Sequence, residues 1–191
     1  MRVVRLAAAI IVLLAMPACV PLASLNPLWD EAHMISEPAL TGSWVSDSGD
    51  AILTVAELSG GRYRLTYVAD DSASQYEVHT VRLEGRLFLD VYPDSDWIEK
   101  RLNGEAFQSL VLTHFFLRAV LEEDRLELSV MDDETLEKKL EQEGLDVPLF
   151  SWKDGLLLAV PTDQVQKLVV HFADDPEVWG EPEAFHLCRA R

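Results

Sequence analysis

From Gly42 onward, alternating apolar and polar positions predict a series of short β-strands. The clearest case is 62–69, where Tyr63, Leu65 and Tyr67 alternate with polar neighbours, as expected for a strand with one buried face. Short connections rich in Gly, Asp and Ser separate most of these runs, which favours antiparallel neighbours. We predict strands over 43–47, 51–58, 62–69, 75–83, 86–92, 110–122, 125–131, 155–160 and 184–189.

The periodicity changes to that of a helix in two places. Residues 133–143 predict a surface helix, with Asp132 as its N-terminal cap and Gly144 at its end. Residues 163–173 predict a second helix, for which Thr162 is the expected cap and which carries one continuous apolar stripe.

The fold class follows from this order of elements. We expect a mostly β fold, either an antiparallel up-and-down barrel or a strongly curled sheet, with two peripheral helices. A closed barrel would remove the exposed edges that such a sheet otherwise carries. Within 75–83 the apolar phase changes, which predicts a β-bulge near His79 and Thr80.

The first nineteen residues have a different character, that of an export signal. Arg2 and Arg5 precede an unbroken apolar run over 6–16, which is too short to span a bilayer but has the length of a signal-peptide core. The run is followed by Ala18 and Cys19, and this end resembles a bacterial lipoprotein signal, in which a small residue precedes the lipidated cysteine. The alternative is an ordinary secretory signal that ends near a cysteine.

The lipoprotein resemblance implies a location and a division of the chain. It implies a signal peptide over 1–18, a lipidated N-terminus and tether over 19–40, and a single β-rich domain over 41–191. Acyl chains on Cys19 would anchor the protein to a membrane. Because Val20 is not the aspartate that retains some lipoproteins at the inner membrane, the implied destination is the outer membrane of a bacterial cell envelope, facing the periplasm.

A second resemblance concerns the start of the first predicted strand. Gly42-Ser43-Trp44 resembles the Gly-x-Trp signature of lipocalins and related calycins. In that family the tryptophan packs across the closed end of the barrel, often under an arginine from late in the chain, here Arg189 or Arg191. The resemblance implies a barrel whose interior or rim binds a small apolar ligand. The alternative is that Trp44 is an ordinary core residue.

Composition narrows the choice of partners. The chain has 33 acidic and 16 basic residues and a formal net charge of −17, so it would repel the phosphates of nucleic acids. Its two cysteines are too few for a disulfide scaffold or a thiolate zinc site. With Cys19 lipidated, Cys188 has no partner, and we expect this thiol to be buried.

The candidate chemistry is sparse. His114 and Arg118 lie four residues apart in one predicted strand, so their side chains share a face and could line a polar site, as in a hydrolase. A solvated strand face is the alternative. No histidine pair has metal-ligand spacing, and no nucleophile elbow, phosphate loop or dinucleotide fingerprint occurs. We therefore assign no catalytic residue, no metal and no cofactor.

Tryptophans outside the predicted strands suggest two further roles. Trp97 lies in the connection 93–106, which could fold over an open barrel end as a lid, or Trp97 could plug that end as core. Trp29, Trp152 and Trp179 lie in connecting segments where anchors for a protein partner occur. The sequence therefore favours a non-catalytic binding module for a small apolar ligand, with an envelope interaction or assembly factor as the alternative.

Overall fold

The fold comes from a computed structural model that describes residues 22–69, 72–102, 108, 110–152, 155–180 and 186–190. Cys19 and the predicted signal peptide lie outside these residues, as does Arg191. The expectations of cleavage and lipidation at Cys19 therefore stay predictions.

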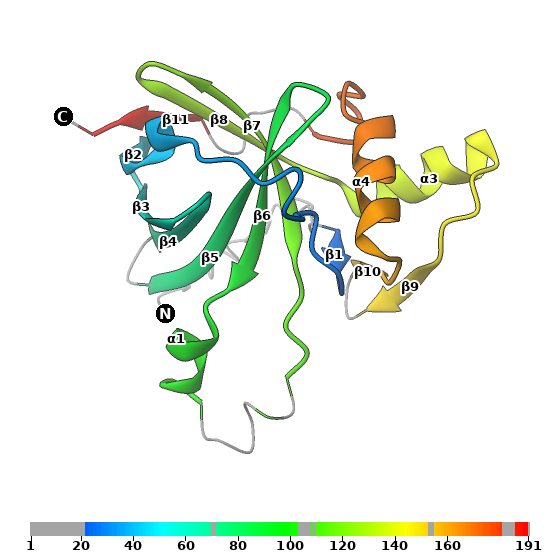
Figure 1. The fold of residues 1–191 in the computed structure, drawn as a ribbon, viewed down its shortest axis with the longest axis horizontal. Coiled ribbons are helices and arrows are strands. Elements are labelled where there is room, and N and C mark those ends of the chain that lie inside the picture. Colours follow the sequence, from blue (N-terminus) through cyan, green and yellow to red (C-terminus); the bar gives the residue numbers. More distant parts are fainter. Residues whose placement is uncertain are drawn as a thin grey trace, which may run out of the picture.

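Eight antiparallel strands close into a barrel, which confirms the predicted mostly β architecture (Figure 1). Neighbours in the barrel follow the order of the sequence, and β11 closes the ring by pairing with both β8 and β2. The barrel strands are β2 (Gly42–Ser46), β3 (Ala51–Ser59), β4 (Arg62–Ala69), β5 (Ser72–Leu83), β6 (Arg86–Pro93), β7 (Phe115–Glu122), β8 (Arg125–Val130) and β11 (His186–Arg189).

A second layer covers one outer side of the barrel (Figure 1). It contains a three-stranded sheet in the order β1-β10-β9 together with two helices. Apart from β1, all of these elements are inserted between β8 and β11. They are β1 (Ala23–Ser24), α3 (Asp133–Glu143), β9 (Leu149–Trp152), β10 (Gly155–Leu158) and α4 (Thr162–His171).

This arrangement creates two hydrophobic cores. One fills the barrel interior, and the other lies between the outer face of β5–β7 and the second layer. Val78 of β5 belongs to the first core, whereas Val81 and Leu83 belong to the second. The phase change in this strand is therefore not a bulge: β5 pairs with β6 without a register shift from Tyr76 to Leu83. The side chains on both faces of this part of β5 are apolar because both faces of the strand are buried.

The two helices begin differently from one another. At α3 the side chain of Asp132 accepts a hydrogen bond from the backbone N–H of Thr135 at 2.7 Å, and Gly144 ends the helix at φ +67°. Both features confirm the prediction. At α4 the predicted cap is wrong, because Thr162 is the first helical residue and Pro161 occupies the cap position without a side-chain hydrogen bond. Proline at this point already fixes the backbone for entry into the helix.

Residues 22–40, the described part of the expected tether, pack against the barrel. Leu22 and Leu28 are buried in the outer core, and Leu40, the last residue of the 3-10 helix η1 (Pro38–Leu40), is buried in the barrel interior. The backbone of Ser24 pairs with that of His114 at the start of β7. The folded domain therefore begins well before residue 41.

Trp44 fills the end of the barrel where η1 enters. Its side chain is fully buried, and the indole Nε1–H donates to the backbone carbonyl of Leu40 at 2.9 Å. The guanidinium carbon of Arg189, on the last strand, lies 4.3 Å from the centroid of the Trp44 ring, within the range of a cation–π contact. The first and last strands of the barrel thus meet in one side-chain contact, which packs this end of the barrel.

Gly42 has a physical role in that contact. A Cβ atom at this position would lie 2.8 Å from Nη1 of Arg189, and the backbone φ of +136° is one that other residues rarely adopt. From this position Arg189 also donates to the carbonyls of Thr41 and Ala39 at 3.0 and 2.7 Å. The Gly-x-Trp spacing therefore leaves room for an arginine above the tryptophan.

Candidate functional site

The barrel interior contains a cavity of about 260 Å³ at the end opposite Trp44. All of its lining residues are aliphatic or aromatic, and they come from β3 to β8 and from β11. The side chains of Tyr67, Tyr76 and Phe115 lie toward the open end, where the rings of Tyr76 and Phe115 meet edge to face with centroids 6.0 Å apart. Because the described lining has no charged side chain, the cavity suits an uncharged, apolar group.

The predicted lid residue, Trp97, does not line this cavity. It lies in the short helix α1 (Ser95–Glu99), which follows β6 on the side of the barrel away from the β5–β6 hairpin (Figure 1). Asp94 caps this helix, and the guanidinium of Arg101 lies over the Trp97 ring at 3.5 Å from its centroid. Trp97 is therefore held by its own segment and is only partly buried.

His114 is part of a buried polar cluster on the outer face of the barrel. Its Nδ1 lies 2.6 Å from a carboxylate oxygen of Asp90, a residue with no exposed surface. The other oxygen of Asp90 accepts the backbone N–H of Leu28 at 2.5 Å. The carboxylate of Asp90 thus contacts both the His114 ring and the backbone of the N-terminal segment. The cluster holds the N-terminal segment against the barrel.

His79 extends the cluster on the neighbouring strand, where it lies opposite Asp90 in the register of β5 and β6. Its ring stacks on that of Trp29, with centroids 4.3 Å apart and planes 12° apart. Nδ1 of His79 and Nε1 of Trp29 are both buried, and neither has a hydrogen-bond partner among the described residues. Burial lowers the pKa of His79, against the opposing charges of Asp90 and Glu77.

His114 and Arg118 are not brought together. Both side chains are on the outer face of the barrel wall, but Phe116 lies between them in β7 and is buried in the outer core. Arg118 donates to the backbone carbonyl of Ala173 at 2.8 Å and not to the His114–Asp90 pair. Their described hydrogen-bond and ring partners differ, so they do not form one polar site.

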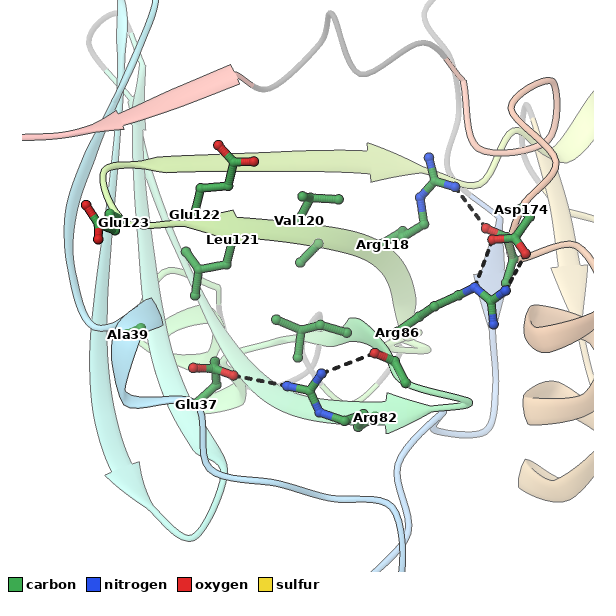
Figure 2. A pocket seen from close by; sticks show the side chains of 14 residues that line it. Glu37, Ala39, Arg82, Arg86, Arg118, Val120, Leu121, Glu122, Glu123 and Asp174 are labelled. Carbon is green, nitrogen blue, oxygen red and sulfur yellow. Dashed lines mark hydrogen bonds and ion pairs between the residues drawn. The ribbon is translucent and has the colours of Figure 1, made fainter.

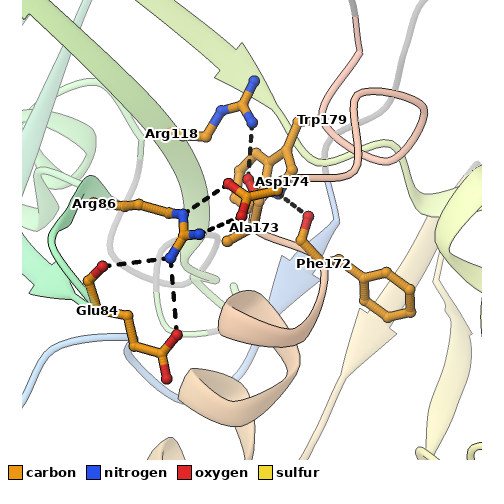
Figure 3. A network of polar contacts seen from close by, with 7 residues as sticks. All are labelled: Glu84, Arg86, Arg118, Phe172, Ala173, Asp174 and Trp179. Atoms are coloured by element: carbon orange, nitrogen blue, oxygen red, sulfur yellow. Dashed lines mark hydrogen bonds and ion pairs between the residues drawn. The ribbon is translucent and has the colours of Figure 1, made fainter.

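Arg118 instead belongs to a contact between the barrel and the turn after α4. Figure 3 shows three consecutive turn residues, 172–174, with different partners on or near the barrel. The carbonyl of Phe172 accepts a hydrogen bond from the indole of Trp179 at 3.0 Å. The carbonyl of Ala173 accepts a hydrogen bond from Arg118. Asp174 forms a bidentate ion pair with Arg86 of β6.

Two expectations about exposure are wrong. Trp179 is fully buried in the outer core, so it is not available as an anchor for a partner. Trp29, by contrast, is only partly buried, by its stack on His79. Cys188 is exposed, because Leu187 is the neighbour that points into the barrel and adjacent strand residues point to opposite faces.

The sequence contained one signal that would have found the partner of His114. Asp90 is the only charged residue in the run 87–92, which is otherwise aliphatic or aromatic, and an acid in such a strand requires a polar partner if both faces are buried. His79 gave no comparable signal, because its position opposite Asp90 depends on the strand register.

Comparison with known proteins adds no assignment: no protein-family model, no curated protein and no solved structure matches the chain. Among the described residues, no helix has the length and apolar character needed to cross a membrane. The same residues contain no group of three or more His, Cys, Asp or Glu side chains placed to hold a metal ion.

We predict that His79 makes the stability of the fold depend on pH. Its pKa in the folded state lies below the reference value of 6.5, so between these two values the folded protein binds fewer protons than the unfolded chain. The contribution to stability is fully present above about pH 6.5 and falls as the pH drops through that value toward the folded pKa.

This dependence can be measured as the free energy of unfolding by urea at several pH values between 5 and 8. His79→Phe keeps an aromatic ring against Trp29 but cannot titrate, and His79→Gln removes both the ring and the titration. Both variants should lose less stability than the wild type as the pH falls. Equal slopes for the wild type and both variants would show that His79 does not carry the effect.

Proposed function

We propose that this protein is a lipid-anchored component of a bacterial cell envelope whose barrel binds a small apolar ligand without catalysis. The observation that carries the proposal is the apolar cavity of about 260 Å³ inside the barrel. That volume is slightly below the range of roughly 300–1,000 Å³ common for sites of drug-sized ligands. A short acyl segment or a small ring system fits it best.

The packing of the barrel ends supports a single direction of entry. Trp44, Leu40 and the segment before them fill one end, so a ligand would enter at the end near Tyr67, Tyr76 and Phe115. The phenol groups of the two tyrosines offer the cavity its only side-chain hydrogen-bonding groups among the described lining residues. A ligand with one weakly polar end and an apolar body would match this distribution.

The described chain begins near that open end, three residues after the proposed anchor. Leu22, three residues after Cys19, donates its backbone N–H to the carbonyl of Met131, which directly follows β8. The last residue of β8, Val130, lines the cavity. Three residues reach about 10 Å, so an acylated Cys19 would hold the cavity entrance near the bilayer from which an apolar ligand would come.

The cavity is tested by filling it. Val91→Phe adds volume inside the barrel, whereas Val68→Phe adds the same volume on the outside of β4, where Val68 is 38% exposed. With N-phenyl-1-naphthylamine as a neutral fluorescent probe, we expect Val91→Phe to weaken binding about tenfold or more, equivalent to about 1.4 kcal/mol. Val68→Phe should bind the probe as the wild type does.

Two outcomes of that titration contradict the proposed ligand site. One is that the wild-type protein does not bind the probe. The other is that Val91→Phe binds the probe with unchanged affinity, provided that both variants unfold at the same urea concentration as the wild type and are therefore folded. The second result would place the probe somewhere other than the barrel interior.

The anchor is tested separately, in bacterial cells that produce the full chain. We expect the protein to fractionate with membranes, to require detergent for release, and to show by intact mass a chain that starts at an acylated Cys19. Cys19→Ser should leave the protein in the soluble fraction, because serine cannot form the thioether. A wild-type chain with Met1 intact that needs no detergent would contradict lipid anchoring.

A further inference from the structure

A second concave surface lies where β6 and β7 separate, and it shares no lining residue with the proposed ligand site. It is a cleft of about 780 Å³ between the β5–β6 hairpin, the last residues of β7 and the turn after α4 (Figure 2). Its apolar wall includes Leu87, Ala119, Val120 and Leu121. Val120 is 48% exposed although it lies in the barrel wall.

The cleft exists because β6 and β7 separate before β7 ends. The ladder between them stops at the pair Leu87 and Ala119. β7 continues to Glu122, and its only described partner over these last residues is β8. Residues 120–122 therefore have an open strand edge along the cleft, and such an edge can accept an additional strand.

Arg118 gives the cleft a positive charge that no direct ion pair among the described residues neutralises, because the nearby carboxylate of Asp174 is bound to Arg86. Its described hydrogen bond is to the uncharged carbonyl of Ala173 at 2.8 Å, and no carboxylate of the described residues forms an ion pair with it. Its Nε is buried and has no acceptor in the described part of the chain. Burial lowers the pKa of this side chain and the charge of Arg86 acts in the same direction, whereas the nearby charge of Asp174, which is bound to Arg86, raises it.

The other arginines of the cleft are already paired. Arg82 contacts Glu37 at 3.1 Å, and Arg86 is held by Asp174. Glu122 and Glu123 line the opposite end of the cleft from Arg118 (Figure 2). A ligand that lies along β7 therefore meets an unpaired cation at one end and carboxylates at the other.

We propose that this cleft binds an extended peptide segment of a partner protein, which adds to the open edge of β7 and places a carboxylate beside Arg118. The open edge offers main-chain hydrogen bonds, and the apolar wall accepts alternate side chains of the peptide. The carboxylate would form the direct ion pair that Arg118 does not have among the described residues. A basic residue toward Glu122 and Glu123 completes the charge match.

The carboxylate could come from an acidic side chain or from the C-terminus of the peptide, and one selection distinguishes the two. Two display libraries of random octapeptides are selected on the folded protein, one followed by a linker and one ending in a free carboxylate. We expect enriched peptides to have alternating apolar residues and, at a common position, either an acidic residue or the free C-terminus. Amidation of the terminus removes binding only in the second case.

Four variants connect the enriched peptides to the cleft. Arg118→Gln and Val120→Asp should each weaken binding about tenfold or more, because one removes the charge and the other places a carboxylate in the apolar wall. The matched controls are Arg64→Gln, at an exposed arginine of β4, and Val68→Asp, at an exposed position of the same strand. Both controls should bind as the wild type does.

Absence of enriched peptides, enrichment without a carboxylate, or equal binding to wild type, Arg118→Gln and Val120→Asp would each overturn the proposal. If Arg118→Gln does not fold, Val120→Asp decides, because it alters an exposed residue. The same peptides should bind Val91→Phe normally, which separates this surface from the cavity in the barrel.

Discussion

The contact between Trp44 and Arg189 determines which end of this barrel is packed and which end contains the cavity. It joins the first and last strands of the ring and fills one end with an indole, a guanidinium and the chain of η1. Gly42 allows this contact, because any side chain there would meet the guanidinium. Since one end is packed in this way, the unfilled volume of the interior lies at the other end, where the proposed ligand would enter.

The second layer has a different consequence. By covering the outer face of β5–β7 it turns part of the barrel wall into a sheet that is buried on both sides. Polar groups on that wall must then find partners inside the protein, as Asp90 does with His114 and with the backbone of Leu28. Where the covering ends, near the turn after α4, the described residues leave the last residues of β7 with an open edge and Arg118 without a direct ion pair.

Much of the barrel was predictable from local patterns. The alternation around Tyr63 and Leu65 gave β4 nearly to the residue, and Asp132 and Gly144 marked the ends of α3. Two of the wrong predictions share a cause, which is burial by distant parts of the chain. The second apolar phase of β5 indicated a covered outer face and not a bulge. Trp179 lies in a connecting segment, yet it is core because the second layer folds over it.

The central claim is that the interior of the barrel is accessible to apolar molecules from the end opposite Trp44. A crystal structure of the protein under xenon pressure tests it most directly, because xenon enters dry apolar cavities. The account predicts xenon between Leu65, Leu117, Leu128 and Leu187, residues that line the cavity. A barrel interior filled by side chains, with no xenon at that position, would contradict it.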